Sequence, residues 1–408
     1  MNILFILKSF DVGGVEAVTT SLANKFKEEG HQVVLWVFYE GQTTLVDRLH
    51  KGIRLIYGNG FKASTENQRL LRQTLISYEI DLVINQWGLP FIPAYTLKKA
   101  SKGLPVKVIA VYHNDPSTNG RLKEVEMVLE KERNPLRKLV LHTRYCLYKM
   151  VTSASMRYVY ENSDKYVLLS DSFIKGFKQF THIKDTKKLV VITNPVTIDV
   201  SDYELDLEGK EKEVVYVGRV DCNQKRVERI IETWGVLEPD FPKWKLRIIG
   251  DGKDRRKVER LVGTLGLKNV FFEGFQYPRP YYERSSLLVL ASEYEGFGLV
   301  IVEAMSFGVV PVVLGSYSAV YDILDNGKDG VVVHYDRDKG FDAKAMAQAL
   351  SGIMGNTRKR HEMAVEAFRK SRNFSIETIS SQWNSVLKNI APGGGHQVRK
   401  RFSYKRKK

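Results

Sequence analysis

The sequence predicts an α/β protein of two doubly wound, Rossmann-like domains that face each other across a cleft. Short apolar runs, typical of buried parallel strands, alternate with segments whose apolar residues recur at helical spacing. This alternation stops in an acidic, polar stretch at residues 201–212 and then starts again. Two such arrays indicate two domains. We place them at residues 1–200 and 213–375, followed by a terminal helix at 376–390 and a basic tail at 391–408.

The N-terminal array begins with a predicted strand at residues 2–8, and the helix that follows it ends at Gly30. Further strands are predicted at residues 33–38, 81–85, 106–112, 166–170 and 189–196. Open parallel sheets bind ligands at the carboxyl ends of their strands. Asn85, Gln86 and His113 follow two of these strands, so they are candidate site residues. The alternative for His113 is an ordinary hydrogen-bonded surface imidazole.

Two adjacent glycines, Gly13 and Gly14, connect the first strand to the first helix. Glycine at such a turn leaves backbone amides exposed, where a diphosphate could rest. A purely structural turn has the same pattern, and the three spaced glycines of dinucleotide-binding proteins are absent. The glycine pair alone therefore leaves both interpretations open.

The segment at residues 134–157 predicts an amphipathic helix, with Asn134 as its cap and Pro135 in its first turn. Residues 133–157 carry six Arg or Lys side chains and no acidic one. Two interpretations are open. The segment is either a core-packed helix with a solvated basic face, or a surface that contacts an anionic membrane or a lipid-linked acceptor.

The C-terminal array contains predicted strands at residues 214–220, 244–249, 270–272, 287–291, 309–314 and 331–334. Helices are predicted at residues 227–236 and 254–265, with three more between 342 and 390. Arg219 ends the first strand and Lys225 precedes the next helix, so two cations suited to a diphosphate converge at a strand end. We expect Arg226 and Arg229 on the exterior of that helix.

The stretch at residues 295–311 combines a loop, a helix and a buried strand. Gly296 and Gly298 allow the backbone to approach a ligand closely. Glu295 lies on this loop, and Glu303 lies about one turn inside the helix that follows. Both carboxylates are therefore expected near a helix amino terminus, where backbone N–H groups and the helix dipole favour a bound phosphate.

These residues and their neighbours resemble the retaining nucleotide-sugar glycosyltransferases of family 4, which have the GT-B fold. The resemblance rests on Glu-Gly-Phe-Gly, Glu-Ala-Met and Val-Pro-Val-Val within 295–313, on Gly-Gly-Val-Glu at 13–16, and on Gly-Arg and Gln-Lys-Arg-Val-Glu within 218–228. It implies transfer of a sugar from a nucleoside diphosphate, expected to be UDP, to an acceptor hydroxyl. Bacterial cell-surface polysaccharide or glycolipid assembly is the implied setting.

The resemblance also implies roles for individual residues. Glu295 would contact the donor sugar, and His113 would lie between the sugar and the acceptor. Arg219 and Lys225 would clamp the diphosphate, and Glu303 would accept hydrogen bonds from the ribose. The other donor-side residues are Gly13, Gly14, Gly274, Phe275, Gly296, Phe297, Gly298 and Leu299, and the acceptor-side residues are Glu16, Asn85 and Gln86. No covalent nucleophile is assigned, and no metal ion or other cofactor is expected, because cations and amides neutralise the diphosphate.

The chain departs from the family pattern at two places. Lys225 follows Arg219 one residue later than in the commonest form, so its neighbour Arg226 competes for the assignment. Residues 315–322 read Gly-Ser-Tyr-Ser-Ala-Val-Tyr-Asp where the family usually has Gly-Gly-x-x-Glu. We therefore assign no phosphate contact to that loop.

Composition narrows the remaining choices. The net charge is +16, but seven of the basic residues lie in 391–408, and the rest of the chain carries +9. Only two cysteines occur, without metal-ligand spacing, which suits a reducing cytoplasm and indicates neither a disulfide framework nor a zinc site. No apolar run reaches the roughly 20 residues of a membrane helix. We expect a cytoplasmic protein that contacts the inner face of the membrane through its basic helix and tail.

Other functions stay open at this point. A nucleotide-sugar epimerase with the GT-B fold, or a glycogen-type synthase, would use a similar site. A non-catalytic scaffold with a decayed site is another alternative, against which the retained Glu295, Glu303 and Arg219 argue. A basic nucleic-acid-binding protein would account for the net charge and for 20 Tyr and 19 Phe, but no module of that class is recognised. We therefore expect a nucleotide-sugar donor, a glycan or lipid-linked acceptor and an anionic membrane surface as partners, and not nucleic acid.

Overall fold

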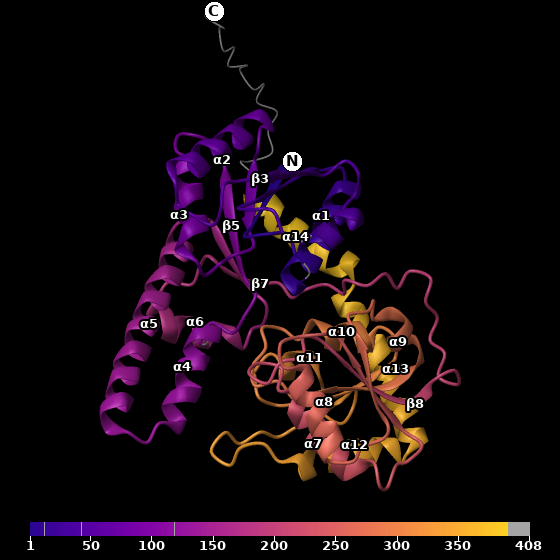
Figure 1. Cartoon of the computed structure of the whole chain (residues 1–408). Coiled ribbons are helices and arrows are strands. Elements are labelled where there is room, and N and C mark those ends of the chain that lie inside the picture. The colour runs from indigo at the N-terminus through magenta and orange to yellow at the C-terminus, as the bar shows by residue number, and fades with distance from the viewer. Residues whose placement is uncertain (12, 42, 118, 391–408) are drawn as a thin grey trace, which may run out of the picture.

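The computed structural model describes residues 1–390 except positions 12, 42 and 118, together with all side chains in that range except those of residues 43, 44 and 131. It contains two parallel sheets, one in each half of the chain, with helices packed on them (Figure 1). Both faces of the first sheet are buried, since Ile3, Phe5 and Leu7 face one apolar cluster while Leu4 and Ile6 face another. The predicted α/β class with two doubly wound sheets is confirmed.

The N-terminal sheet has seven strands in the order β3-β2-β1-β4-β5-β6-β7. The strands are β1 (Asn2–Leu7), β2 (Gln32–Val37), β3 (Arg54–Tyr57), β4 (Leu82–Asn85), β5 (Lys107–Tyr112), β6 (Lys165–Leu168) and β7 (Leu189–Val191). Its helices are α1 (Gly14–Glu28), α2 (Thr65–Ser77), α3 (Phe91–Ala100), α4 (Gly120–Lys131), α5 (Pro135–Glu161) and α6 (Phe173–Thr181), with a 3-10 turn at Thr43–Arg48. The strand order reverses between β1 and β4, and a crevice at such a reversal is where doubly wound sheets bind ligands.

The C-terminal sheet has six strands in the order β10-β9-β8-β11-β12-β13. The strands are β8 (Glu211–Val217), β9 (Lys245–Ile249), β10 (Val270–Gly274), β11 (Ser285–Leu290), β12 (Val310–Leu314) and β13 (Val331–Val333). Its helices are α7 (Val227–Leu237), α8 (Arg255–Thr264), α9 (Arg279–Arg284), α10 (Leu299–Met305), α11 (Val320–Ile323), α12 (Ala343–Met354) and α13 (Thr357–Ser371). The order reverses between β8 and β11, so the loops after these two strands meet at the switch point.

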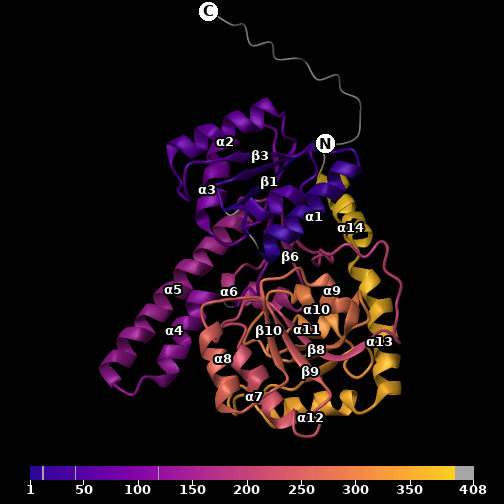
Figure 2. The ribbon, with the colours of Figure 1, turned by 45° about the vertical axis from the view of Figure 1, so that its right-hand side comes forward.

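The last helix, α14 (Ile376–Ile390), follows a 3-10 turn at Arg372–Phe374 and returns to the N-terminal half (Figures 1 and 2). Trp383 packs its ring edge-on against Phe26 of α1, with 6.3 Å between ring centroids. The Asn384 side-chain amide donates to Glu29 at 2.9 Å. The chain therefore crosses between the two sheets twice, once through residues 192–210 and once before α14.

Several elements differ from the prediction. The structure adds β3, α2, α3, α4 and α6, whose sequences are short or largely polar at the surface. The strand predicted at 189–196 ends at Val191, because the chain then leaves the sheet and the Val196 amide donates to the Phe374 carbonyl at 2.8 Å. The helix predicted at 134–157 exists as α5. Only Met156, Val159 and Tyr160 of it are buried, so the core-packed alternative is wrong for most of its length.

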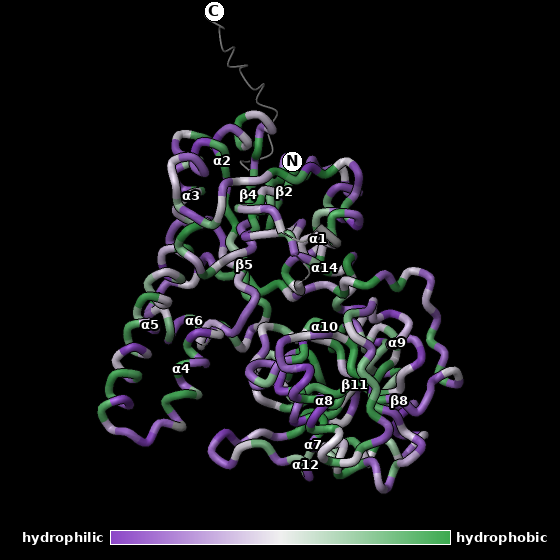
Figure 3. The backbone as a smooth tube through the Cα atoms, in the orientation of Figure 1, coloured by the Kyte–Doolittle hydropathy of each residue, from purple (hydrophilic) through white to green (hydrophobic). Residues whose placement is uncertain are grey.

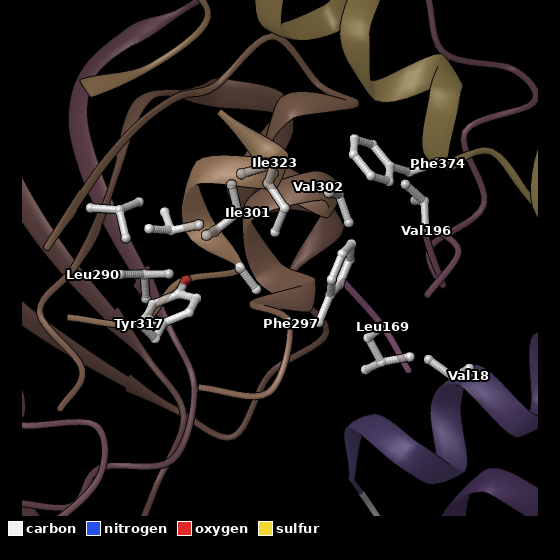
Figure 4. Close-up of a cluster of buried hydrophobic side chains, with 14 of the residues drawn as sticks. Val18, Leu169, Val196, Leu290, Phe297, Ile301, Val302, Tyr317, Ile323 and Phe374 are labelled. Carbon is white, nitrogen blue, oxygen red and sulfur yellow. The ribbon is translucent and has the colours of Figure 1, made fainter. Parts of the chain in front are cut away.

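One apolar cluster runs through both halves of the molecule and includes Phe297, from the loop at residues 295–298 that precedes α10 (Figure 4). Phe297 points from that loop between Leu169, from the segment after β6, and Phe374. The Phe297 and Phe374 rings meet edge-on at 5.8 Å, and Phe297 is buried. The loop between Glu295 and α10 is thus held by packing from both domains.

Candidate active site

The loops after β8 and β11 bring the predicted cation and carboxylate together. The Lys225 ammonium lies 2.6 Å from Oε1 of Glu295, and both side chains are largely buried. The Ser292 hydroxyl donates to the same carboxylate oxygen at 2.7 Å. These two contacts to one oxygen fix the orientation of the Glu295 carboxylate.

Asp221, which the sequence analysis did not single out, organises the turn that carries Lys225. Its Oδ1 accepts the backbone amides of Asn223, Gln224 and Lys225 at 3.1, 2.7 and 3.1 Å. Its Oδ2 accepts from Nε of Arg219 at 2.8 Å. Burial opposes ionisation, but these bonds hold the pKa of Asp221 below its ordinary value. The sequence signal that could have identified Asp221 is an aspartate at the start of a polar turn, where the side chain commonly binds the backbone amides that follow it.

Arg219 lies at the mouth of the same turn. Besides Asp221, its guanidinium donates to the Gln224 side chain at 3.0 Å, and the side chain keeps 61% of its surface exposed. An oriented and accessible guanidinium suits a phosphate ligand. Arg226 instead pairs with Glu228 at 2.8 Å, so the geometry favours Lys225 over Arg226 as the second cation.

Arg229 contradicts the expected exterior position. It is 4% exposed, pairs with Glu293 at 2.6 Å and lies over the Tyr335 ring at 5.4 Å from the centroid. It also donates to the Ala291 carbonyl at the end of β11. This arginine therefore supports the loop that carries Glu295, because the inner face of α7 packs against that loop and not against solvent.

Gly296 and Gly298 are required for different reasons. A Cβ on Gly296 would lie 1.8 Å from the His113 carbonyl oxygen, so this loop touches the N-terminal domain directly. Gly298 has φ +89°, in the left-handed region that favours glycine, and is the residue before α10. Because α10 has only seven residues, the dipole at its amino terminus stabilises a bound diphosphate less than the sequence analysis predicts.

His113 follows β5 and contacts Gln86, which follows β4. His113 Nε2 lies 2.7 Å from Oε1 of Gln86. Burial lowers the pKa of His113 to about 4, so its imidazole is neutral at physiological pH. Neighbouring Asn85 is buried, and its side chain closes a local turn with the backbone of Trp87 at 3.1 and 3.3 Å. This geometry favours a structural role for Asn85.

Gly13, Gly14 and Glu16 lie on the side of the candidate site that the N-terminal domain forms. A Cβ on Gly14 would lie 4.0 Å from Leu299, so this glycine faces α10 across the domain boundary. The Glu16 carboxyl folds back toward Gly13, where a Cβ would lie 2.4 Å from its Oε2. Glu16 is buried, and its carboxyl group lies against the Gly13 turn.

Glu303 lies inside α10 and contacts different partners from Glu295. Thr197, in the segment between the domains, donates to its Oε1 at 2.5 Å, and the Tyr282 hydroxyl lies 3.5 Å from Oε2. Gly274, the last residue of β10, has φ +71° and its carbonyl accepts from the amide of Gly250, which follows β9, at 2.7 Å. The Phe275 ring is 67% exposed. These two residues lie at the predicted strand end.

The loop that departs from the family pattern joins the two domains. The Ser170 hydroxyl donates to the Asp322 carboxylate, and the Ser172 hydroxyl donates to Ser318 at 2.9 Å. Ser316 donates to the Ser292 carbonyl at 2.5 Å. This loop therefore connects the two domains by hydrogen bonds.

Among the residues that the structure describes, no group of three or more His, Cys, Asp or Glu side chains is arranged to hold a metal ion.

Burial raises the pKa of Glu16 and Glu303 from 4.5 to about 7. Between these values the folded state binds more protons than the unfolded state, so the free energy of unfolding should fall as pH rises from about 4.5 to 7. Each group contributes at most about 1.4 kcal/mol per pH unit. Urea unfolding at several pH values should give a shallower pH dependence for Glu303→Gln. An unchanged dependence would contradict the assignment.

Two family descriptions match consecutive parts of this chain. Residues 12–200 match "Glycosyltransferase Family 4", and residues 199–370 match "Glycosyl transferases group 1". A Campylobacter jejuni α-1,4-N-acetyl-D-galactosaminyltransferase that acts on an undecaprenol-linked glycan is 23% identical over 393 residues, 96% of this chain and 99% of that protein. The Escherichia coli lipopolysaccharide 1,6-galactosyltransferase is 31% identical over 191 residues, 45% of this chain and 52% of that protein.

Solved structures share the whole architecture. The Anabaena protein HepE in complex with UDP-glucose superposes with a TM-score of 0.74 at 18% identity, covering 95% of this chain and 100% of that chain. Staphylococcus aureus TarM, bound to UDP and α-GlcNAc-glycerol, gives a TM-score of 0.70 at 14% identity over 95% of this chain and 100% of that chain. At these identities the likeness establishes the fold.

Proposed function

This chain belongs to glycosyltransferase family 4, with a group 1 glycosyltransferase domain and the GT-B fold, and from this premise we propose a specific reaction. In this reaction the protein transfers a hexosyl group from a UDP-sugar to a hydroxyl of a glycan or lipid-linked acceptor, with retention at the anomeric carbon. Relatives that act on lipopolysaccharide and on undecaprenol-linked glycan support this class of acceptor.

The observation that carries the proposal is the contact between Lys225 and Glu295 at the switch point of the C-terminal sheet. An incoming diphosphate competes with Glu295 for the ammonium of Lys225, and Arg219 supplies a second cation. Glu295 then accepts hydrogen bonds from the donor sugar. Because charge is neutralised by side chains and backbone amides, the proposed reaction requires no metal ion.

The remaining residues position the donor and the acceptor. Neutral His113 offers a hydrogen bond to the sugar or acceptor without adding charge, and Gly14 lets the donor lie close to α1. Glu303 is proposed to bind the ribose, in competition with Thr197. No side chain is proposed as a covalent nucleophile, so the two glutamates do not act as a hydrolase pair.

Replacement of Glu295 by glutamine tests the reaction. A panel of UDP-sugars is incubated with the protein, and released UDP is measured with and without EDTA. The wild-type chain should release UDP from at least one donor in either condition. The Glu295→Gln variant should turn over at least about tenfold more slowly, because a neutral amide orients the sugar less strongly. Release of UDP at the normal rate by this variant would contradict the role of Glu295.

The hairpin of α4 and α5 supports a second part of the proposal, which is peripheral binding to an anionic membrane. The hairpin projects from the N-terminal sheet, and α5 is about 40 Å long (Figure 1). Seven large apolar side chains on it are 51–75% exposed: Val128, Leu136, Leu139, Val140, Leu147, Met150 and Val151. Figure 3 shows hydrophobic, green segments alternating with hydrophilic ones along α5. No helix of residues 1–390 that the structure describes has the length and apolarity to cross a bilayer.

Basic side chains lie among these apolar ones on α5, at Arg137, Lys138, Arg144 and Lys149. Apolar insertion at the interface combined with attraction to anionic lipid is the usual basis of such binding. The predicted tail at 391–408 lies outside the described residues, and its seven cations would each add on the order of 1 kcal/mol near an anionic leaflet. We place the protein in the cytoplasm, bound reversibly to the inner face of the membrane.

Sedimentation with anionic vesicles tests the membrane surface. The full chain should sediment at low salt and be released by high salt, and a chain ending at Ile390 should bind more weakly. Leu139→Asp should reduce binding, since it places a charge in the apolar face. Ile76→Asp on α2, which is similarly exposed at 53%, is the matched control. Failure of the full chain to sediment at low salt would overturn this part alone.

A further inference from the structure

A cavity of about 420 Å³ lies between α4 and the turn after β8. Its walls are Glu124, Met127, Val128 and Glu132 from the N-terminal domain and Asn223 from the C-terminal domain. None of these residues belongs to the donor machinery described above. The cavity is within the size range of small-molecule sites.

The cavity borders the proposed site on the C-terminal side. Asn223 belongs to the turn that Asp221 holds by its backbone amides. The next residue, Gln224, donates from its side chain to the Tyr294 carbonyl at 3.3 Å, and its own carbonyl accepts the Glu293 amide at 2.7 Å. One wall of the cavity is therefore continuous with the segment that ends at Glu295.

On the N-terminal side, the first residue of α4, the helix that lines the cavity, lies close to the segment that carries Glu295. Tyr294 precedes Glu295 and is near α4, since its hydroxyl lies 3.4 Å from where a Cβ on Gly120 would be. Burial and then Asp221 raise the pKa of Tyr294 to about 12, and Glu124 adds to that shift. The negative charge of Glu124 thus reaches the residue next to Glu295.

The lining has a definite chemistry. The two carboxylates accept hydrogen bonds from hydroxyl groups, and the Asn223 amide both accepts and donates them. Met127 and Val128 offer an apolar surface to the C–H face of a sugar ring. A negatively charged ligand would meet two like charges at close range, which is unfavourable. The neighbouring helix α5 carries positive charge instead, from its basic side chains.

We propose that this cavity binds the acceptor glycan through sugar residues that carry no negative charge, while the phosphate groups of a lipid-linked acceptor lie toward α5. This inference rests on the proposed function and specifies its acceptor class. It also gives the acceptor a direction, because the lipid end lies at the hairpin and the reacting sugar lies at Glu295.

Ligand-observed NMR on the full chain with saturating UDP provides the test, with maltose and chitobiose as neutral probes and digalacturonate as the anionic probe. At least one neutral disaccharide should give a saturation-transfer signal, and digalacturonate should give none. Met127→Trp, which fills the cavity, should abolish the signal. Ile76→Trp on α2, at a side chain that is 53% exposed, is the control and should leave it unchanged.

Charge reversal makes the test sharper. Glu124→Lys should allow digalacturonate to bind and weaken the neutral probes, whereas Glu130→Lys, the same change on α4 outside the cavity lining, should do neither. Calorimetry with UDP should give wild-type affinity for all these variants, and loss of UDP binding by the wild-type chain would instead count against the proposed function. Absence of binding by both neutral probes, or binding unaffected by Met127→Trp, would overturn the inference.

Discussion

Replacing Gly296 by alanine should reduce sugar transfer by at least about a hundredfold, because displacement of reacting groups by about 1 Å has an effect of that size. The new Cβ would lie 1.8 Å from the His113 carbonyl oxygen and 2.8 Å from its carbon. These are backbone atoms, so no side-chain rotation relieves the clash. The loop carrying Glu295 must move away from the N-terminal domain, and both proposed catalytic residues are displaced.

The control for this change is another glycine-to-alanine substitution. Gly352 lies in α12, and a Cβ there would meet no atom within 4 Å. Gly352→Ala should keep full activity and stabilise the protein by about 0.5–1 kcal/mol, because alanine favours the helix. Initial rates and thermal unfolding would be measured for both variants. Normal transfer by Gly296→Ala would show that the contact with His113 is absent during turnover.

Replacing Lys225 by alanine should weaken UDP binding by about 1.5–3 kcal/mol, the range for a hydrogen bond to a charged group. The variant removes the cation that we assign to the diphosphate. It also leaves Glu295, which is 7% exposed, without its ammonium partner. An uncompensated carboxylate beside the diphosphate adds repulsion to the lost attraction, so the effect should lie toward the upper end of this range.

Arg226→Ala is the matched control for Lys225→Ala. Arg226 is the adjacent cation, but it pairs with Glu228 and donates to the Cys222 carbonyl. Calorimetry should therefore give nearly wild-type UDP affinity for Arg226→Ala. Equal losses for the two variants would indicate a general effect of positive charge, and a loss confined to Arg226→Ala would reverse the assignment.

The local sequence pattern was sufficient to predict the features that depend only on residues close together in the chain. The strand-turn-helix alternation placed Arg219 and Lys225 after one strand and Glu295 before one helix, and the structure has β8 and α10 there. Parallel strands align their carboxyl ends, so residues that follow them converge whatever the details of packing. That rule places Lys225 and Glu295 at the same edge of the sheet, and the structure adds the ion pair between them.

Other features depend on which surfaces meet, and no local pattern encodes them. Arg229 is buried because α7 packs its inner face on the loop after β11, although a charged helix residue is usually exposed. Glu303 and Thr197 meet across 106 residues of sequence. The pKa shifts of Glu16 and His113 likewise come from burial, which only the assembled domains produce.

The sequence by itself determined the two doubly wound domains, their order and the residues at the strand ends, because periodicity and glycine placement are properties of short segments. The tertiary structure alone decided that α14 returns to the N-terminal domain, that residues 315–322 bind Ser170 and Ser172, and that α4 forms a cavity with Asn223. Each of these depends on long-range packing, in which the energy of a contact is shared between segments that are unrelated in sequence.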